Sequence, residues 1–191
     1  MRVGDHVYFA PGIRFSDLDL GGTRLPAQYR TRVEEYYLRP AQRAAEAGDA
    51  FAAGLLALAA LDSMSRLYFG PNRPSRRVKF DFPTFTRLLL PSFSAPANAE
   101  ILYDKYRNGL VHEARLKDGC QFAVGRVQTL DTTGPTPIVD PTHLVTEVRG
   151  ALERLVSELN SSRQFRNEFT KLLRRDFRYE LDESENKSES I

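Results

Sequence analysis

Apolar residues recur at helical spacing in the first third of the chain. Over residues 26–47 they fall three or four positions apart with charged residues between them, which predicts an amphipathic helix. These positions are Tyr29, Val33, Tyr36 and Tyr37. Pro40 interrupts the pattern, and because proline lacks a backbone N–H we expect the helix to be kinked or split there.

The segment from Ala50 to Phe69 is apolar on all sides. Asp49 is a suitable N-cap, and Gly70-Pro71 is a clear stop signal. A helix without a polar face belongs in a protein interior, so we expect this one to be the central buried helix.

Further helices are predicted along the rest of the chain. A short helix is expected near residues 83–90, and a strong one over residues 97–116. Asp140-Pro141 starts another, because aspartate is a good N-cap and proline suits the first turn. Its apolar positions are Leu144, Val148, Leu152, Leu155 and Leu159. Ser161 or Ser162 caps a last, basic helix that ends near Arg178.

Extended structure is predicted in only two places. Short strands over 121–124, 127–130 and 136–139 form a small β-hairpin insertion before the penultimate long helix. Residues 1–22 contain turn signals and read as an irregular arm or a single short strand. The expected fold is therefore mainly α, an antiparallel helical bundle in one domain over residues 1–178.

Composition agrees with one globular domain. The chain has 191 residues, of which 41% are hydrophobic and 27% charged, and this excludes wholesale disorder. A lone Cys120 excludes a disulfide scaffold. The longest uncharged apolar run, residues 50–61, is too short to span a bilayer, and the N-terminus carries no secretory signal. We expect a cytoplasmic protein with no membrane partner.

Charge is unevenly distributed. Residues 179–191 carry five acids and one lysine, a net charge of −4, and we expect this tail to be disordered. Residues 1–178 carry 26 basic and 20 acidic side chains, a net charge of +6, which permits a nucleic-acid partner. The loop over residues 71–79 is the candidate RNA contact, although a solvated loop is the alternative. Its cations are Arg73, Arg76, Arg77 and Lys79.

Candidate chemistry is restricted by the three histidines. His6 and His143 have no cysteine or second histidine at ligand spacing, so no metal site is expected. The chain has no glycine-rich phosphate loop and no nucleophile elbow, and Cys120 lacks the local signature of a catalytic thiol. We therefore expect no cofactor.

His112 is different, because it lies late in the predicted helix 97–116. At 100° per residue, apolar side chains share one face of this helix. They are Ala99, Leu102, Tyr103, Tyr106 and Leu110. Asp104, Arg107, Asn108 and His112 fall on the other side, so the helix is expected to present these four groups away from its own core.

The string Arg107-Asn108-Gly109-Leu110-Val111-His112 resembles the R-N-x-x-x-H motif of ribonucleases in the HEPN family (higher eukaryotes and prokaryotes nucleotide-binding domain). The resemblance implies a HEPN-like helical bundle. It also implies a homodimer in which two such motifs face each other, so that each chain supplies half of a site that cleaves RNA.

The chemistry suits these residue types. A histidine can accept or deliver the proton of a ribose 2′-OH that attacks the adjacent phosphate. Arginine can hold the charge that develops on the phosphoryl oxygens. We expect Arg107 and His112 to act in this way, with Asn108 orienting His112 from one turn away and Asp104 holding Arg107.

The expected function is a metal-independent endoribonuclease in stress response or in defence against mobile elements, with RNA as substrate and a cognate antitoxin or regulatory protein as a candidate partner. A second interpretation is a non-catalytic HEPN module that binds RNA, a nucleotide or a partner protein. A third is a helical structural protein in which the motif residues form surface salt bridges.

Overall fold

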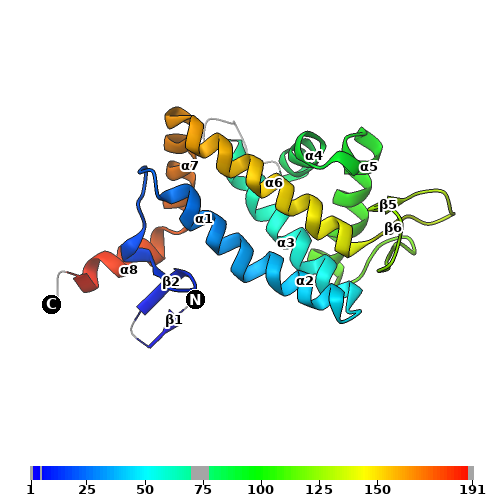
Figure 1. Ribbon diagram of the computed structural model, residues 1–191, viewed down its shortest axis with the longest axis horizontal. Coiled ribbons are helices and arrows are strands. Elements are labelled where there is room, and N and C mark those ends of the chain that lie inside the picture. The colour runs from blue at the N-terminus through cyan, green and yellow to red at the C-terminus, as the bar shows by residue number, and fades with distance from the viewer. Residues whose placement is uncertain (1, 5, 70–77, 189–191) are drawn as a thin grey trace.

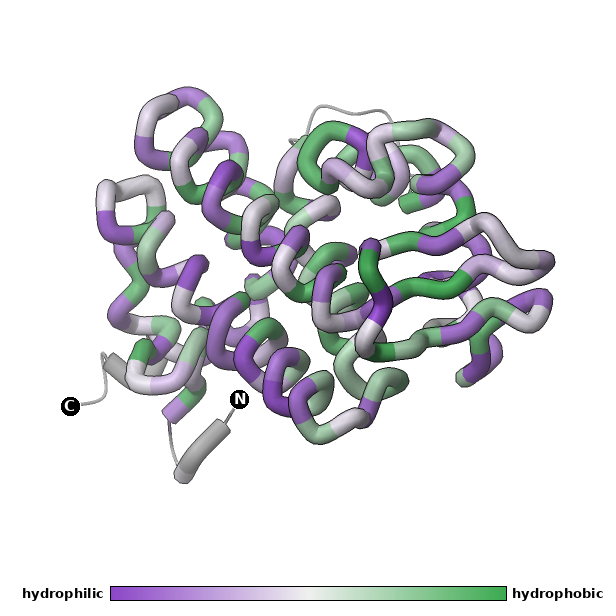
Figure 2. Tube along the Cα trace, turned by 45° about the vertical axis from the view of Figure 1, so that its right-hand side comes forward, coloured by the Kyte–Doolittle hydropathy of each residue, from purple (hydrophilic) through white to green (hydrophobic). Residues whose placement is uncertain are grey.

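The computed structural model describes residues 2–4, 6–69 and 78–188, and the chain is mainly helical (Figure 1). The long helix α3 (Ala50–Tyr68) lies at the centre and contacts α2 (Arg39–Glu46), α4 (Val78–Leu89) and α6 (Pro141–Ser161). The helices are striped with hydrophobic and hydrophilic stretches in Figure 2, as amphipathic helices around a shared core should be.

The first helical segment is continuous across Pro40. It consists of α1 (Leu25–Val33), a π-helical stretch η2 (Glu34–Leu38) and α2. Pro40 occupies the first turn of α2, where its missing N–H costs least. The wider π turn before it accommodates the proline, so the interruption expected at Pro40 takes the form of a π-bulge.

The central helix is confirmed, with one exposed edge. Ala57, Leu61 and Met64 are fully buried, whereas Phe51 and Leu55 are more than 40% exposed. By length and composition α3 could also cross a membrane, and it is the one such helix among the described residues. The core helix of a globular protein passes the same test, and half of the relevant window is buried against the other helices.

The second half of the bundle begins with α4 and continues through a short 3-10 turn, η3 (Pro91–Phe93). The helix expected over residues 97–116 forms as three pieces. These are α5 (Pro96–Ile101) and the π-helical segments η4 (Leu102–Arg107) and η5 (Gly109–Glu113).

The expected β-hairpin insertion is wrong in its topology. Residues 121–139 form a three-stranded mixed sheet in the order β4-β6-β5. The strands are β4 (Gln121–Phe122), β5 (Leu130–Asp131) and β6 (Ile138–Val139). β6 pairs parallel with β4 and antiparallel with β5. Periodicity located the strands, but it carries no information on which strands pair.

α6 begins where Asp140 caps it, since the Asp140 carboxylate accepts a hydrogen bond from the Thr142 N–H. Ser162 likewise caps α7 (Arg163–Asp176) by accepting from the Phe165 N–H. The chain then continues into α8 (Arg178–Ser188), so the disordered tail expected from Tyr179 onward is wrong over this helix. Leu181 is buried, and α8 contacts β2 and η1, which explains how an acidic segment becomes ordered.

The N-terminal residues are more regular than the expected arm. β1 (Arg2–Val3), β2 (His6–Ala10) and β3 (Ile13–Arg14) form an antiparallel sheet, followed by the 3-10 turn η1 (Phe15–Asp17). Phe9 and Phe15 are buried and pack edge-to-face, 5.5 Å between ring centroids. The Arg32 guanidinium lies 4.9 Å from the Phe9 ring, which ties the sheet to α1. Aromatic burial therefore orders the segment.

Candidate functional site

Arg107 is buried at the end of η4, with only 7% of its surface exposed. Its Nε donates to Oδ1 of Asp62 on α3 at 3.1 Å, and its Nη2 lies at the same distance from that oxygen. Its Nη1 donates to Oδ1 of Asn108, also at 3.1 Å. A buried charge needs a paired, hydrogen-bonded partner, and Asp62 supplies it.

Asp62 joins two arginines at the surface of α3. Its Oδ2 accepts a hydrogen bond of 2.8 Å from Nε of Arg66, one turn further along the helix. Arg66 is exposed, whereas Arg107 is buried. One carboxylate between two guanidinium groups leaves this cluster with a net charge of +1.

The cluster forms the polar end of a pocket of about 320 Å³. Apolar side chains of α3 and η5 form the other walls, notably Leu55, Leu58 and Leu110. Tyr37 and Ser63 add hydroxyl groups to the lining. A mostly apolar cavity with a few convergent polar groups is the usual form of a small-ligand or substrate site.

His112 lies on η5, five residues after Arg107, and is exposed. Within the described part of the chain, no hydrogen bond, ion pair or ring contact holds its imidazole. η5 ends at Glu113, and the C-cap residue Ala114 adopts a left-handed conformation with φ of 52°. Arg107 is thus fixed at the pocket wall, whereas His112 is not among the residues that line this pocket and is free to meet a group from outside.

The expectation that Asp104 holds Arg107 is wrong. Asp104 lies 3.3 Å from Nζ of Lys105 and 3.6 Å from Nζ of Lys117. Lys105 also forms an ion pair with Asp118, which raises the pKa of the Lys105 ammonium and lowers that of the Asp118 carboxyl. Asn108 was expected to orient His112, but its side-chain oxygen is engaged by Arg107.

The expected outward position of Arg107 is also wrong. A projection at 100° per residue assumes α-helical turns, whereas η4 and η5 have wider i→i+5 turns. Arg107 is rotated toward α3 and Asp62, while Asp104 and His112 stay at the surface. The apolar face was predicted correctly for Leu102, Tyr106 and Leu110, which are all buried.

The buried Tyr106 side chain connects η4 to the mixed sheet. The Tyr106 hydroxyl donates toward the carbonyl oxygens of Gln121 and Pro137, at 3.1 and 2.8 Å, and so fixes η4 to the mixed sheet. Burial raises the pKa of the Tyr106 hydroxyl. Burial also raises the pKa of the nearby Cys120 thiol, which opposes a nucleophilic role.

The predicted RNA-binding loop lies almost entirely outside the described residues, including Arg73, Arg76 and Arg77. Lys79 is described and is exposed in the first turn of α4. Within residues 2–4, 6–69 and 78–188, no group of three or more His, Cys, Asp or Glu side chains gathers to hold a metal ion.

Sequence reasoning missed Asp62, which is the partner that Arg107 needs. A signal was present, since Asp62 is the first charged residue after the uncharged run 50–61 and stays on the central helix. An acid in that position favours a cation beside it, but the sequence does not say that the distant Arg107 provides it in addition to Arg66, one turn further along.

Comparisons with known proteins found no matching family model, no matching curated protein and no matching solved structure.

Proposed function

We propose that the chain is a metal-independent endoribonuclease of the HEPN type, located in the cytoplasm, in which Arg107 and His112 form half of a composite site. One observation carries the proposal: a guanidinium fixed by Asp62 at the wall of an open pocket lies five residues before an unrestrained, exposed imidazole. The motif also resembles that of the ribonucleases, and the chain is mainly helical.

Arg107 is suited to hold a phosphate. Its contacts with Asp62 and Asn108 use one hydrogen on each nitrogen of the guanidinium, which has five N–H groups in total. The second hydrogens of Nη1 and Nη2 remain for a phosphoryl oxygen at the pocket. Because the group is already held in place, little reorganisation is needed as charge develops on the phosphate.

His112 is suited to move a proton. An imidazole changes its charge near neutral pH, so it can take the proton of the attacking 2′-OH or protonate the leaving 5′ oxygen. One imidazole can do only one of these in a single step. A second copy of the chain would bring the other, which is why we propose a two-fold symmetric homodimer with the two His112 side chains facing each other.

The decisive experiment compares two exposed histidines. Purified protein is incubated with RNA in EDTA, together with His112→Ala and with His6→Ala as the matched control, since His6 is also exposed but lies on β2, far from η5 in the chain. Loss of one general acid–base group should reduce the cleavage rate by about 10² to 10⁴-fold. We expect that loss in His112→Ala and full activity in His6→Ala.

Two results would contradict this function. Equal cleavage by His112→Ala and the wild-type protein would exclude the mechanism, and so would a monomer at micromolar concentration in light scattering. RNA binding without cleavage by the wild-type protein would instead support the non-catalytic module, which the engaged state of Arg107 and the neighbouring pocket also favour. An antitoxin or regulatory partner stays a candidate for either form.

A further inference from the structure

α7 presents a face of exposed cations that the proposed site does not use. Arg163, Lys171 and Arg174 are exposed and fall eight and three residues apart, which places them on one side of the helix. We call these three residues the α7 basic face. At 1.5 Å per residue it extends over about 16 Å.

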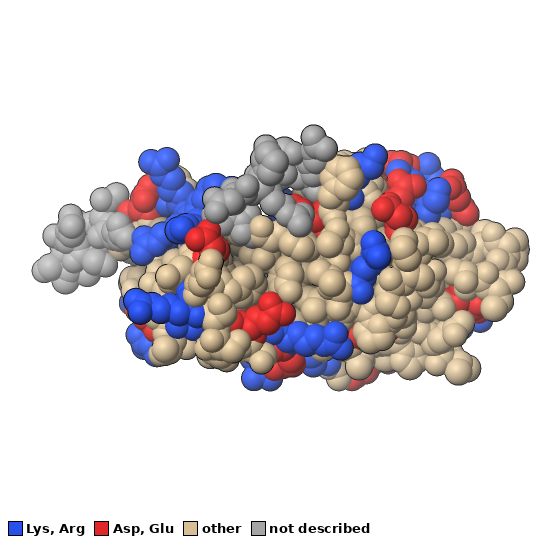
Figure 3. Space-filling model, turned by 90° about the horizontal axis from the view of Figure 1, so that it is seen from above, with Lys and Arg blue, Asp and Glu red and all other residues tan. Residues whose placement is uncertain are grey.

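These cations are largely free of acids. Among the described residues, no ion pair holds Arg163 or Arg174, and Lys171 has only Glu168, 2.7 Å away at the surface. Surface pairs of this kind are weak and screened by salt. Figure 3, a view from above, shows Lys and Arg side chains gathered at the end of the molecule where α7 lies.

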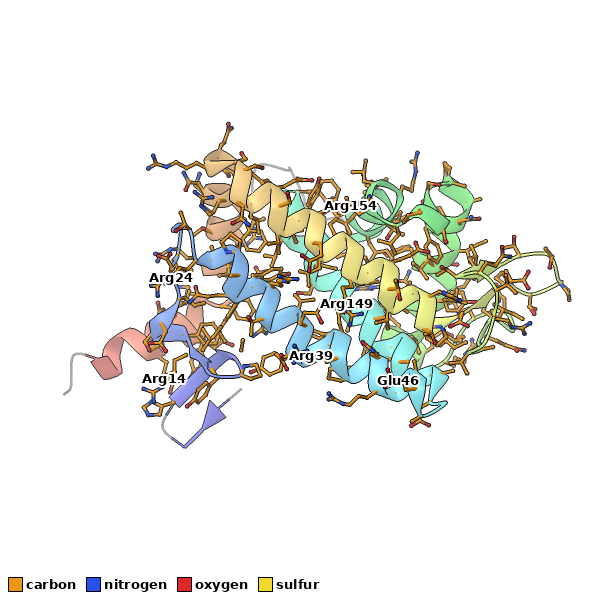
Figure 4. The ribbon with its side chains drawn as sticks, viewed as in Figure 1. Arg14, Arg24, Arg39, Glu46, Arg149 and Arg154 are labelled. Carbon is orange, nitrogen blue, oxygen red and sulfur yellow. The ribbon has the colours of Figure 1, made fainter. Side chains whose placement is uncertain are left out.

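The arginines on the surface of α2 and α6 are instead paired with acids. Arg39 and Arg149 lie on the neighbouring helices α2 and α6 (Figure 4). Arg39 lies 2.7 Å from Glu35, and Arg149 lies 3.0 Å from Glu34. Arg149 links α6 to η2, and Arg39 pairs one turn back within its own helical segment, so a polyanion would have to compete with both acids.

The α7 basic face also carries hydrogen-bond donors. A shallow hollow between Arg163 and Lys171 is lined by the amides Gln164 and Asn167. Amide and guanidinium groups contact phosphate and sugar oxygens in most nucleic-acid interfaces. The apolar side chains of α7, such as Phe169 and Leu173, are buried, so the helix exposes no hydrophobic face to insert into a membrane.

We infer that the α7 basic face binds the phosphodiester backbone of single-stranded RNA, as a docking surface separate from the Arg107–His112 site. The inference rests on the proposed RNA substrate. The pocket beside Arg107 is lined largely by α3, which includes Asp62 and Arg66, and α3 also contacts α7. A substrate bound at both places would therefore follow the central helix.

Fluorescence anisotropy with a labelled single-stranded RNA tests the inference. The background is His112→Ala, so that the RNA stays intact. One variant changes Arg163, Lys171 and Arg174 to Gln. The matched control changes Arg43, Arg87 and Arg154 to Gln, which removes the same charge from exposed positions on α2, α4 and α6.

The α7 variant should bind RNA at least about tenfold more weakly. The slope of log affinity against log salt concentration, measured between about 50 and 200 mM, should be shallower by about 2. Each phosphate contact contributes about 0.7 to that slope for single strands, and the variant removes three cations. The control should keep the wild-type slope. Equal losses in both variants would show an effect of net charge alone and overturn the docking surface, as would unchanged binding by the α7 variant.

Absence of RNA binding by the His112→Ala background would also overturn it. So would binding to vesicles of anionic lipid that disappears in the α7 variant while RNA binding is unchanged. Failure of the proposed ribonuclease function is distinguishable from failure of the docking surface. A wild-type protein that never cleaves RNA, but whose RNA binding shows the salt dependence that requires the α7 basic face, would refute the ribonuclease function and retain the docking surface.

Discussion

The η4–η5 segment and α7 both carry several cations, but the two regions use them in opposite ways. Arg107 is buried against Asp62, and the lysines around it pair with surface acids. On α7, Arg163 and Arg174 stay in water. Buried pairs fix geometry at the expense of desolvation, whereas exposed cations cost nothing to the fold and remain available to an anion. The same residue type therefore serves positioning in one region and long-range attraction in the other.

The largest expected difference is in the free energy of unfolding, between a variant of the buried Arg107 and a variant of the exposed Arg174. Arg107→Met leaves the partly buried Asp62 with the exposed Arg66 but without its buried partner, which should lower the free energy of unfolding by about 2 to 3 kcal/mol. Arg174→Met removes an exposed cation and should change it by no more than about 0.5 kcal/mol. Urea denaturation of the two variants measures the difference.

A double variant sharpens that result. Asp62→Leu combined with Arg107→Met removes both charges, so it should recover most of the stability lost in Arg107→Met. Additive losses would show that the two side chains do not act as a pair. Because Arg107 variants are expected to unfold more easily, His112→Ala is the cleaner probe of catalysis.

A smaller effect is expected where α7 passes into α8. Leu181 is buried, and its truncation in Leu181→Ala should cost about 2 kcal/mol. Asp182→Asn removes only the exposed Arg178–Asp182 pair at 3.6 Å, so its melting temperature should stay at the wild-type value. The opposite order, with Asp182→Asn the more damaging, would mean that charge and not apolar burial orders α8.

The regular helices were predicted better than the candidate site. Ala50–Tyr68 and the capped start at Asp140 follow from apolar periodicity and N-cap preference, both of which are local properties. The position of Arg107 depends on π-helical turns and on Asp62, 45 residues earlier in the chain. The parallel pairing of β4 with β6 and the docking of Leu181 are likewise long-range. A helical projection contains none of this.

The smallest changes in stability are expected for two glycine substitutions, one in the π-helical segment η5 and one in the α-helix α6. In the η4–η5 region, a Cβ on Gly109 would lie 2.4 Å from the backbone oxygen of Arg115, so Gly109→Ala must displace the turn that follows His112. Overpacking of this kind costs about 1 to 2 kcal/mol.

In α6, which leads into α7, a Cβ on Gly150 would meet nothing within 4 Å, and alanine is the better helix former. Gly150→Ala should therefore stabilise the protein by about 0.5 to 1 kcal/mol. Thermal denaturation should move in opposite directions for the two variants, and RNA cleavage should fall only in Gly109→Ala. Equal stabilisation by both would show that η5 tolerates an ordinary helical residue, and that the close contact at Gly109 does not set the position of His112.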